Sequence, residues 1–171
     1  MEQAGSKSRK SPIKAELDVG QTSAGARVAL VGVGHELRGD DVAGLLVVRA
    51  ADRHLPARDD LLIIEAGSAP ESFTGPLRRF APDVVLLIDA ADLGGPPGTV
   101  IWIDPGAVGG AGASTHTLPL HVFASYLETT IGCAVGIIGI QPASLAFDAP
   151  VSATVQAAVT AVVDGLAAEL F

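Results

Sequence analysis

The sequence predicts an α/β fold, a three-layer α/β/α sandwich whose five-stranded sheet is mostly parallel with one antiparallel strand. Two observations lead to this fold class. Short continuous apolar runs recur along the chain, as in strands that are buried on both faces. Segments with apolar residues at helical spacing separate most of these runs, as in βαβ units. Apolar residues make up 49% of the chain and aromatic residues only 4%, so aliphatic side chains must form the core.

The individual elements follow from the apolar runs and from the signals at their ends. The helix at 68–80 is expected to begin with a capping box formed by Ser68 and Glu71, with Pro70 in its first turn. The segment "ADLGGPPG" after the third strand is shorter than the roughly twelve residues that a parallel crossover requires, so the fourth strand should run antiparallel. We expect strands at 27–34, 61–66, 83–90, 99–104 and 134–140, and helices at 41–55, 68–80, about 117–130 and about 151–170.

The chain of 171 residues is long enough for one domain with a single core. Residues 1–26 are polar and small. They cannot bury enough apolar surface to offset the loss of conformational entropy, so we expect a flexible N-terminal extension. Residues 27–171 then form a single α/β domain.

Composition excludes several classes of partner. The formal charge is -8, and an acidic chain without a basic patch binds nucleic acids and anionic membranes poorly. The single cysteine, Cys133, cannot form an intrachain disulfide. No apolar run approaches the roughly 18–20 residues that span a bilayer. We therefore expect a cytoplasmic protein that binds neither nucleic acid nor membranes, and we take it to be monomeric.

Acidic residues follow two of the predicted strands. In open α/β sheets, ligands bind beyond the carboxyl ends of the strands, where the strand order reverses, and right-handed crossovers put the first and third strands beside this point. Asp40 and Asp41 follow the first strand, and Asp89 ends the third. We expect Asp40 to cap the following helix, with Asp41 in its first turn. A purely structural role at the helix start stays open for both, but Asp41 and Asp89 should meet at one edge of the sheet.

A third candidate is His116, in the glycine-rich segment "GASTHTLPL" before a predicted helix. A lone histidine in a loop is more often incidental. Together with Asp41 and Asp89, however, it completes a set of two oxygen ligands and one nitrogen ligand. Such a set suits a divalent transition metal and leaves coordination positions open for a substrate.

Two other functions remain as alternatives. Gly32 and Gly34 after a strand, with Glu65 at the end of the next, suggest a dinucleotide-binding module, but the third glycine is Gly39 and the spacing differs from G-x-G-x-x-G. A pyrophosphate would also meet Asp40 and Asp41. Repulsion of about 4 kcal/mol between unit charges exceeds the roughly 0.3–1 kcal/mol that a helix dipole offers an anion. The second alternative is an autonomous metallohydrolase acting on small substrates.

Five segments of the chain occur in an order that resembles the hydrogenase maturation endopeptidases, in particular the formate-hydrogenlyase-type branch. They are "GVGHELRGDDVAG", "EAGSAPES", "LLIDAADLGGPPGTV", "STHTLPL" and "GIIGIQP". The resemblance covers about residues 27–165 and implies a phosphorylase/hydrolase-like mixed sheet. It also implies an endopeptidase that removes the carboxy-terminal extension of a nickel–iron hydrogenase large-subunit precursor after nickel insertion.

The resemblance assigns roles to residues of this chain. Asp41, Asp89 and His116 correspond to the nickel ligands of the family and would be the catalytic residues. The nickel would arrive on the precursor and would not be held tightly by the free enzyme. Two positions depart from the family pattern. His35 replaces the usual Asn, and the second segment begins with Glu65-Ala66-Gly67 where the family usually has Asp followed by two glycines. Residues expected to contact the substrate are Glu65, Gly67, Ser68, His35 and Gln141, although Gln141 is equally suited to binding backbone groups of a loop.

Overall fold

The computed structural model describes residues 25–103, 105 and 119–171. Its sheet has five strands in the order β2-β1-β3-β5-β4. The predicted fold class is confirmed, and each predicted strand is present to within about one residue at most ends. The strands are β1 (Val28–Val33), β2 (Leu61–Gly67), β3 (Val84–Ala90), β4 (Val100–Ile103) and β5 (Ala134–Ile140).

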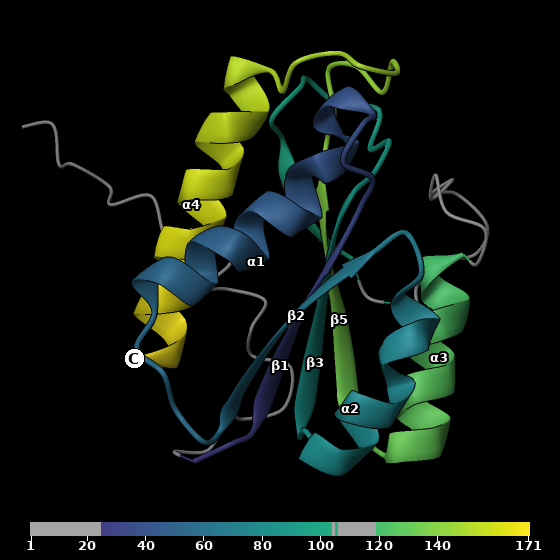
Figure 1. The fold of residues 1–171 in the computed structure, drawn as a ribbon, viewed down its shortest axis with the longest axis vertical. Coiled ribbons are helices and arrows are strands. Elements are labelled where there is room, and N and C mark those ends of the chain that lie inside the picture. The colour runs from purple at the N-terminus through teal and green to yellow at the C-terminus, as the bar shows by residue number, and fades with distance from the viewer. Residues whose placement is uncertain (1–24, 104, 106–118) are drawn as a thin grey trace, which may run out of the picture.

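Helices cover both faces of the sheet and complete the three layers (Figure 1). Helices α1 and α4 lie on one face, and α2 and α3 lie on the other. Short 3₁₀ segments, η1 (Gly39–Val42) and η2 (Pro70–Phe73), precede the first two helices. The α-helices are α1 (Ala43–His54), α2 (Thr74–Phe80), α3 (Leu120–Ile131) and α4 (Ala153–Leu170).

Strand direction also agrees with the expectation from the short β3–β4 link. Strands β2, β1, β3 and β5 are parallel to one another, whereas β4 pairs with β5 in the antiparallel sense. From β1 the chain moves outward to β2 and then returns to the other side of β1 with β3. The strand order therefore reverses between β1 and β3, which is where an open α/β sheet binds its ligand.

The core divides into two clusters because successive residues of a strand face opposite sides of the sheet. On one side, Leu30, Leu86 and Ile88 pack with apolar residues of α1 and α4. On the other side, Val31 and Leu87 pack with residues of α2 and α3. By the same alternation, Asp89 belongs to the side of β3 that α2 and α3 cover.

Two predicted helix starts were wrong. The carboxylate of Asp40 does not cap α1, because Asp40 lies inside η1 and its hydrogen bonds go to another part of the chain. The capping box of Ser68 and Glu71 does not form either. The residue before η2 is Ala69, with no side-chain cap, so Pro70 begins a 3₁₀ turn and the α-helix starts only at Thr74. Of the predicted extension, only residues 25 and 26 are among those described.

Helix α4 qualifies the statement that no apolar segment is long enough to cross a bilayer. Within the described residues, this 18-residue helix meets that criterion of length and composition. However, it contributes Val155, Val162 and Leu166 to the core cluster that it shares with α1 and the sheet. A core helix of a folded domain has a similar composition, and α4 packs its buried face on this core.

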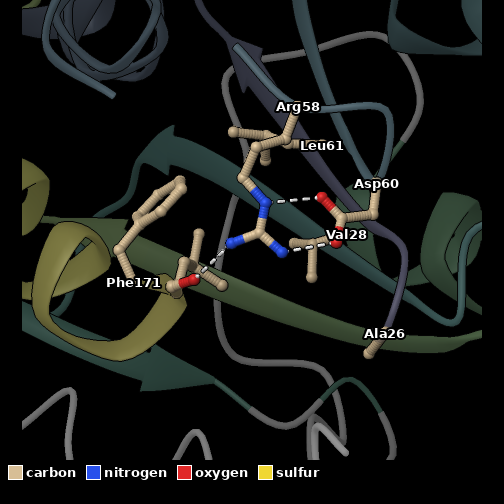
Figure 2. A pocket seen from close by; sticks show the side chains of 7 residues that line it. Ala26, Val28, Arg58, Asp60, Leu61 and Phe171 are labelled. Atoms are coloured by element: carbon tan, nitrogen blue, oxygen red, sulfur yellow. Dashed lines mark hydrogen bonds and ion pairs between the residues drawn. The ribbon is translucent and has the colours of Figure 1, made fainter. Parts of the chain in front are cut away.

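The carboxy terminus is fixed at the amino end of the parallel strands (Figure 2). The Arg58 guanidinium donates to the Asp60 carboxylate, at 2.7 Å for Nε, and to the carbonyl oxygen of Leu170 at 3.0 Å. The same guanidinium lies 5.0 Å from the ring centroid of Phe171. The hollow that these residues line has a volume of about 30 Å³, which suffices for a water molecule and not for a larger ligand.

The packing of α1 onto the sheet depends on two facing glycines. A Cβ atom at Gly44 would overlap the carbonyl oxygens of Val33 and Ile88, and one at Gly32 would overlap the carbonyl oxygen of Gly44. The start of α1 therefore lies directly on the ends of β1 and β3. Larger residues at these positions would push the helix away from the sheet.

We predict that Gly44→Ala lowers the free energy of unfolding by about 3 kcal/mol or more, at the upper end of the usual cost of overpacking, because the clash is with backbone atoms. Gly75→Ala is the matched control in α2, since its Cβ would meet only Arg79 Nη1 at 3.6 Å. The control should be neutral or gain about 0.5 kcal/mol from helix propensity. Urea unfolding measures both values, and equal stabilities for the two variants would contradict the close packing.

Candidate active site at the carboxyl edge of the sheet

A tight turn after β1 brings η1 back to the end of the strand. Gly34 has φ 153°, and a Cβ atom there would overlap the carbonyl oxygen of Asp41. The amide of His35 donates to the same oxygen at 3.2 Å. The backbone of Asp41 is therefore held against the end of β1, and a residue with a side chain could not replace Gly34 without moving it.

Asp41 and Asp89 lie at the same edge of the sheet. Asp41 comes three residues before Gly44, whose backbone packs on the carbonyl groups of Val33 and Ile88, and Asp89 is the residue after Ile88. Both carboxylates are buried, with exposed fractions of 1% for Asp41 and 2% for Asp89. Taking two carboxylates out of water is costly unless hydrogen bonds or a cation compensate for it. This edge, formed where the strand order reverses, is the candidate active site.

Asp40 joins this edge to the loop between β5 and α4. Its carboxylate accepts hydrogen bonds from the amides of Ala143 at 2.8 Å, Ser144 at 3.3 Å and Ser152 at 2.7 Å, and from the Ser152 hydroxyl at 2.9 Å. Its amide donates to the carbonyl oxygen of Ser144 at 2.9 Å. Ser152 is also the N-cap of α4, because its Oγ accepts from the amide of Val155 at 3.3 Å. Asp40 thus determines how η1 and the start of α4 are placed relative to each other.

The hydrogen bonds to Asp40 outweigh its burial. Burial by itself raises the pKa of the Asp40 carboxyl, but the bonds from Ser152, Ala143 and Ser144 stabilise the charged form and leave the pKa below its ordinary value of 3.8. Sequence reasoning did not find this role. The sequence feature that points to it is the pair of adjacent acids, Asp40 and Asp41. A helix start needs only one acid, so the second can bind a distant part of the chain.

An open hollow beside this edge contains four of the five residues predicted to contact the substrate. It has a volume of about 340 Å³, enough for a peptide side chain or two. The end of β2 forms part of its lining. There the amide of Gly34 donates to the carbonyl oxygen of Gly67 at 3.0 Å and joins the turn after β1 to the end of β2. The hollow is lined by Gly34, His35, Glu36, Leu37, Leu45, Glu65, Ala66, Gly67 and Ser68.

Arg49 on α1 pairs with the two acidic residues that line this hollow, Glu36 and Glu65. It donates to Glu65 Oε2 at 2.9 Å and to Glu36 Oε2 at 3.3 Å. The hydrogen bond from Arg49 lowers the pKa of Glu65, which is exposed. Glu65 is thus paired with a cation of its own chain, an arrangement that does not favour the ribose-binding role considered for it. The Arg49 pairing was also missed, because the two residues are 16 positions apart and lie on different elements.

Gln141, the fifth predicted contact residue, is engaged with the loop between β3 and β4. Its Oε1 accepts from the amides of Leu93 at 2.6 Å and Gly95 at 3.4 Å, and its Nε2 donates to the carbonyl oxygen of Pro142 at 3.3 Å. Only 8% of the residue is exposed. These contacts correspond to the second possibility considered for it, an amide that binds loop backbone.

The third predicted ligand, His116, lies outside the described residues. Among residues 25–103, 105 and 119–171, no three His, Cys, Asp or Glu side chains form a group that could hold a metal ion. Asp41 and Asp89 alone do not make such a group, so a metal site at this edge requires a further ligand. Helix α3 begins at Leu120, four residues after His116 in the chain.

Comparisons with known proteins agree with this architecture. A family model for hydrogenase maturation proteases of the HycI type matches residues 45–169. The hydrogenase 3 maturation protease of Escherichia coli is 33% identical over 135 residues, which span 78% of this chain and 84% of that protein. The crystal structure of a NiFe hydrogenase maturation protease, HycI from Thermococcus kodakarensis, is 35% identical with a TM-score of 0.78, covering 85% of this chain and 92% of that one. The solution structure of the Escherichia coli endopeptidase HycI is 32% identical with a TM-score of 0.69, covering 80% and 86%.

The fold and these matches define a class of protein, a peptide-bond hydrolase. The family model and the relatives each cover most of the chain, and the residues that the model matches include Asp89. The chain belongs to the hydrogenase maturation protease family. The resemblance inferred from the five sequence segments is thereby confirmed.

We predict that Asp40→Asn destabilises the protein near neutral pH by about 2 kcal/mol or more, because the amide nitrogen cannot accept the bonds that a carboxylate oxygen accepts. The pKa of Asp40 is lowered on folding, so its ionised form stabilises the fold above pH 3.8 and that contribution is lost as pH falls through the lower folded value. Denaturant unfolding at several pH values should show the difference between wild type and variant shrinking in acid. The exposed Asp52→Asn on α1 is the control, and a difference that stays constant down to about pH 2 would contradict the ionised role.

Proposed function

We propose that this protein is the endopeptidase that removes the carboxy-terminal extension of a nickel–iron hydrogenase large-subunit precursor after nickel insertion. The observation that carries the proposal is the pair of buried carboxylates, Asp41 and Asp89, at the edge where the strand order reverses. Membership of the hydrogenase maturation protease family supports hydrolysis of a peptide bond as the reaction. The relatives named for hydrogenase maturation support a hydrogenase precursor as the substrate.

We propose that Asp41, Asp89 and His116 coordinate the nickel ion carried by the precursor. Two carboxylate oxygens and one imidazole nitrogen suit a divalent transition metal. Such a set is too small to retain the metal against water, so the ion would arrive with the substrate and leave with the product. Supporting this set, Asp89 lies on the side of β3 that is covered by α3, the helix that follows His116 in the chain. Cleavage would then require a loaded precursor.

The reaction is hydrolysis of one peptide bond. Water adds to the scissile carbonyl carbon, the C–N bond breaks, and a proton passes to the departing amine. The metal, when bound, supplies Lewis acidity at that carbonyl. A carboxylate of Asp41 or Asp89 that is not needed as a ligand can take the proton from the attacking water. Burial of both groups excludes bulk water and strengthens their interaction with a cation.

The substrate segment would lie in the hollow between the turn after β1 and the end of β2. We propose that His35, Glu65, Gly67 and Ser68 contact it there, because all four line this hollow. The hollow adjoins Asp41 through the backbone, since the amide of His35 donates to the carbonyl oxygen of Asp41. Gln141 would act indirectly, by holding the β3–β4 loop that follows Asp89. We further propose that the protein works as a cytoplasmic monomer, in keeping with its acidic charge and its single, buried cysteine; size-exclusion chromatography with light scattering tests the monomer.

We predict that Asp41→Asn, Asp89→Asn and His116→Ala each reduce cleavage of a nickel-loaded precursor by about a hundredfold or more, since each removes a ligand or the proton acceptor. Intact-mass spectrometry follows the loss of the extension. Asp52→Asn, an exposed acid on α1, is the matched control and should cleave at the wild-type rate. Full activity of Asp89→Asn in a correctly folded protein would remove the basis of the proposal.

We also predict that freshly purified, untagged protein contains far less than one nickel ion per chain, because three ligands give a weak site. Elemental analysis measures this directly. Equilibrium dialysis with nickel should show binding that is weak and is further reduced by Asp41→Asn. A stoichiometric metal that survives purification would instead favour the autonomous metallohydrolase.

A further inference from the structure

Two large apolar side chains are exposed next to the candidate active site. Leu37 is 50% exposed and Phe147 is 72% exposed. They come from the turn after β1 and from the loop between β5 and α4, more than a hundred residues apart. The loops that carry them are joined by a hydrogen bond of 2.7 Å from the amide of Asp148 to the carbonyl oxygen of Leu37. We call this pair of residues the apolar rim.

The backbone beneath the apolar rim is firmly held. Gly39 has φ 53° and packs so closely on the second loop that a Cβ atom there would lie 2.7 Å from the carbonyl oxygen of Ser144. Arg38 Nε donates to the carbonyl oxygen of Leu145 at 3.5 Å. The four hydrogen bonds that the Asp40 carboxylate accepts join the same two loops. A partner that binds here loses little free energy to ordering of these loops.

The apolar rim is continuous with the hollow that we assign to the substrate. Leu37 lines that hollow together with Gly34 and Glu65, and it precedes Asp41 by four residues. A precursor whose extension lies in this hollow would therefore contact Leu37. Phe147, on the adjoining loop, does not line the hollow, so a contact with it would come from a part of the precursor outside the segment that lies there.

We propose that the apolar rim is the docking surface for the folded body of the hydrogenase large-subunit precursor, which contacts Leu37 and Phe147 through an apolar patch beside its extension. This inference rests on the proposed function. The acids around the hollow and the overall charge of -8 make a strongly acidic patch on the partner unfavourable. Buried aromatic and aliphatic anchors within a polar rim are the usual carriers of binding energy in protein interfaces.

The test is the double variant Leu37→Ser/Phe147→Ser assayed with nickel-loaded precursor. Both residues are exposed, so the variant should keep the wild-type melting temperature. We expect KM to rise about tenfold or more, with kcat nearly unchanged, because docking is lost and the ligands are intact. Phe171→Ser, which removes an aromatic that is 51% exposed at the amino end of the parallel strands, is the matched control and should leave KM unchanged.

A binding measurement separates docking from chemistry. In an Asp89→Asn background, calorimetry with the same precursor should give a Kd that rises about tenfold or more when the rim is substituted. If wild type cleaves the precursor but the rim variant has an unchanged KM and Kd, the docking proposal is wrong and the proposed function stands. If wild type does not cleave it at all, the proposed function fails and the docking proposal fails with it. Loss of a wild-type dimer on substitution, with KM unchanged, would assign the rim to a second copy and overturn the proposal.

Discussion

The ionised carboxylate of Asp40 is the interaction on which the geometry of the carboxyl edge depends. Four hydrogen bonds run from Ala143, Ser144 and Ser152 to this one group. They connect the first loop of the domain with its last loop, and they also fix the N-cap of α4. Hydrogen bonds to a buried charged acceptor are stronger than neutral ones, so this contact resists the fluctuations that loops usually undergo. Asp41, the next residue, is placed as a consequence.

The acids of this edge have different electrostatic partners. Asp40 is stabilised by amides and a hydroxyl, whereas Glu36 and Glu65 share the Arg49 guanidinium. In our proposal, Asp41 and Asp89 receive their cation with the substrate. The partners of Asp40, Glu36 and Glu65 allow these three acids to lie near one edge of a strongly acidic chain without a large loss of stability.

Most of the fold could be predicted from the sequence because its signals are local. Continuous apolar runs such as Val84–Ala90 define buried strands, and the short segment after Asp89 was enough to predict an antiparallel β4. Topology rules then gave the common edge of Asp41 and Asp89. Helix starts were less predictable. Ser68 and Glu71 matched a capping box, yet the chain forms a 3₁₀ turn from Pro70 and leaves the box unused.

The partners of Asp40 and Arg49 could not have been derived in the same way. Ser152 is 112 residues from Asp40 in the chain, and no periodicity relates two such positions. An acidic residue beside a glycine turn looks the same whether it caps its own helix or binds a distant loop. The close approach of Gly44 to Val33 and Ile88 likewise depends on the assembled sheet. Long-range contacts of this kind become visible only when the packing of elements is known.

The position of the carboxy terminus has a practical consequence. Arg58 holds the last turn of α4 beside the start of β1 and β2, and Phe171 lies at that end of the molecule (Figures 1 and 2). Asp41 and Asp89 lie at the far end of the same parallel strands. A resin or sensor chip coupled through a short tail after Phe171 would therefore leave the candidate active site facing the solution. A protein immobilised in this orientation could bind the precursor without obstruction by the resin or chip.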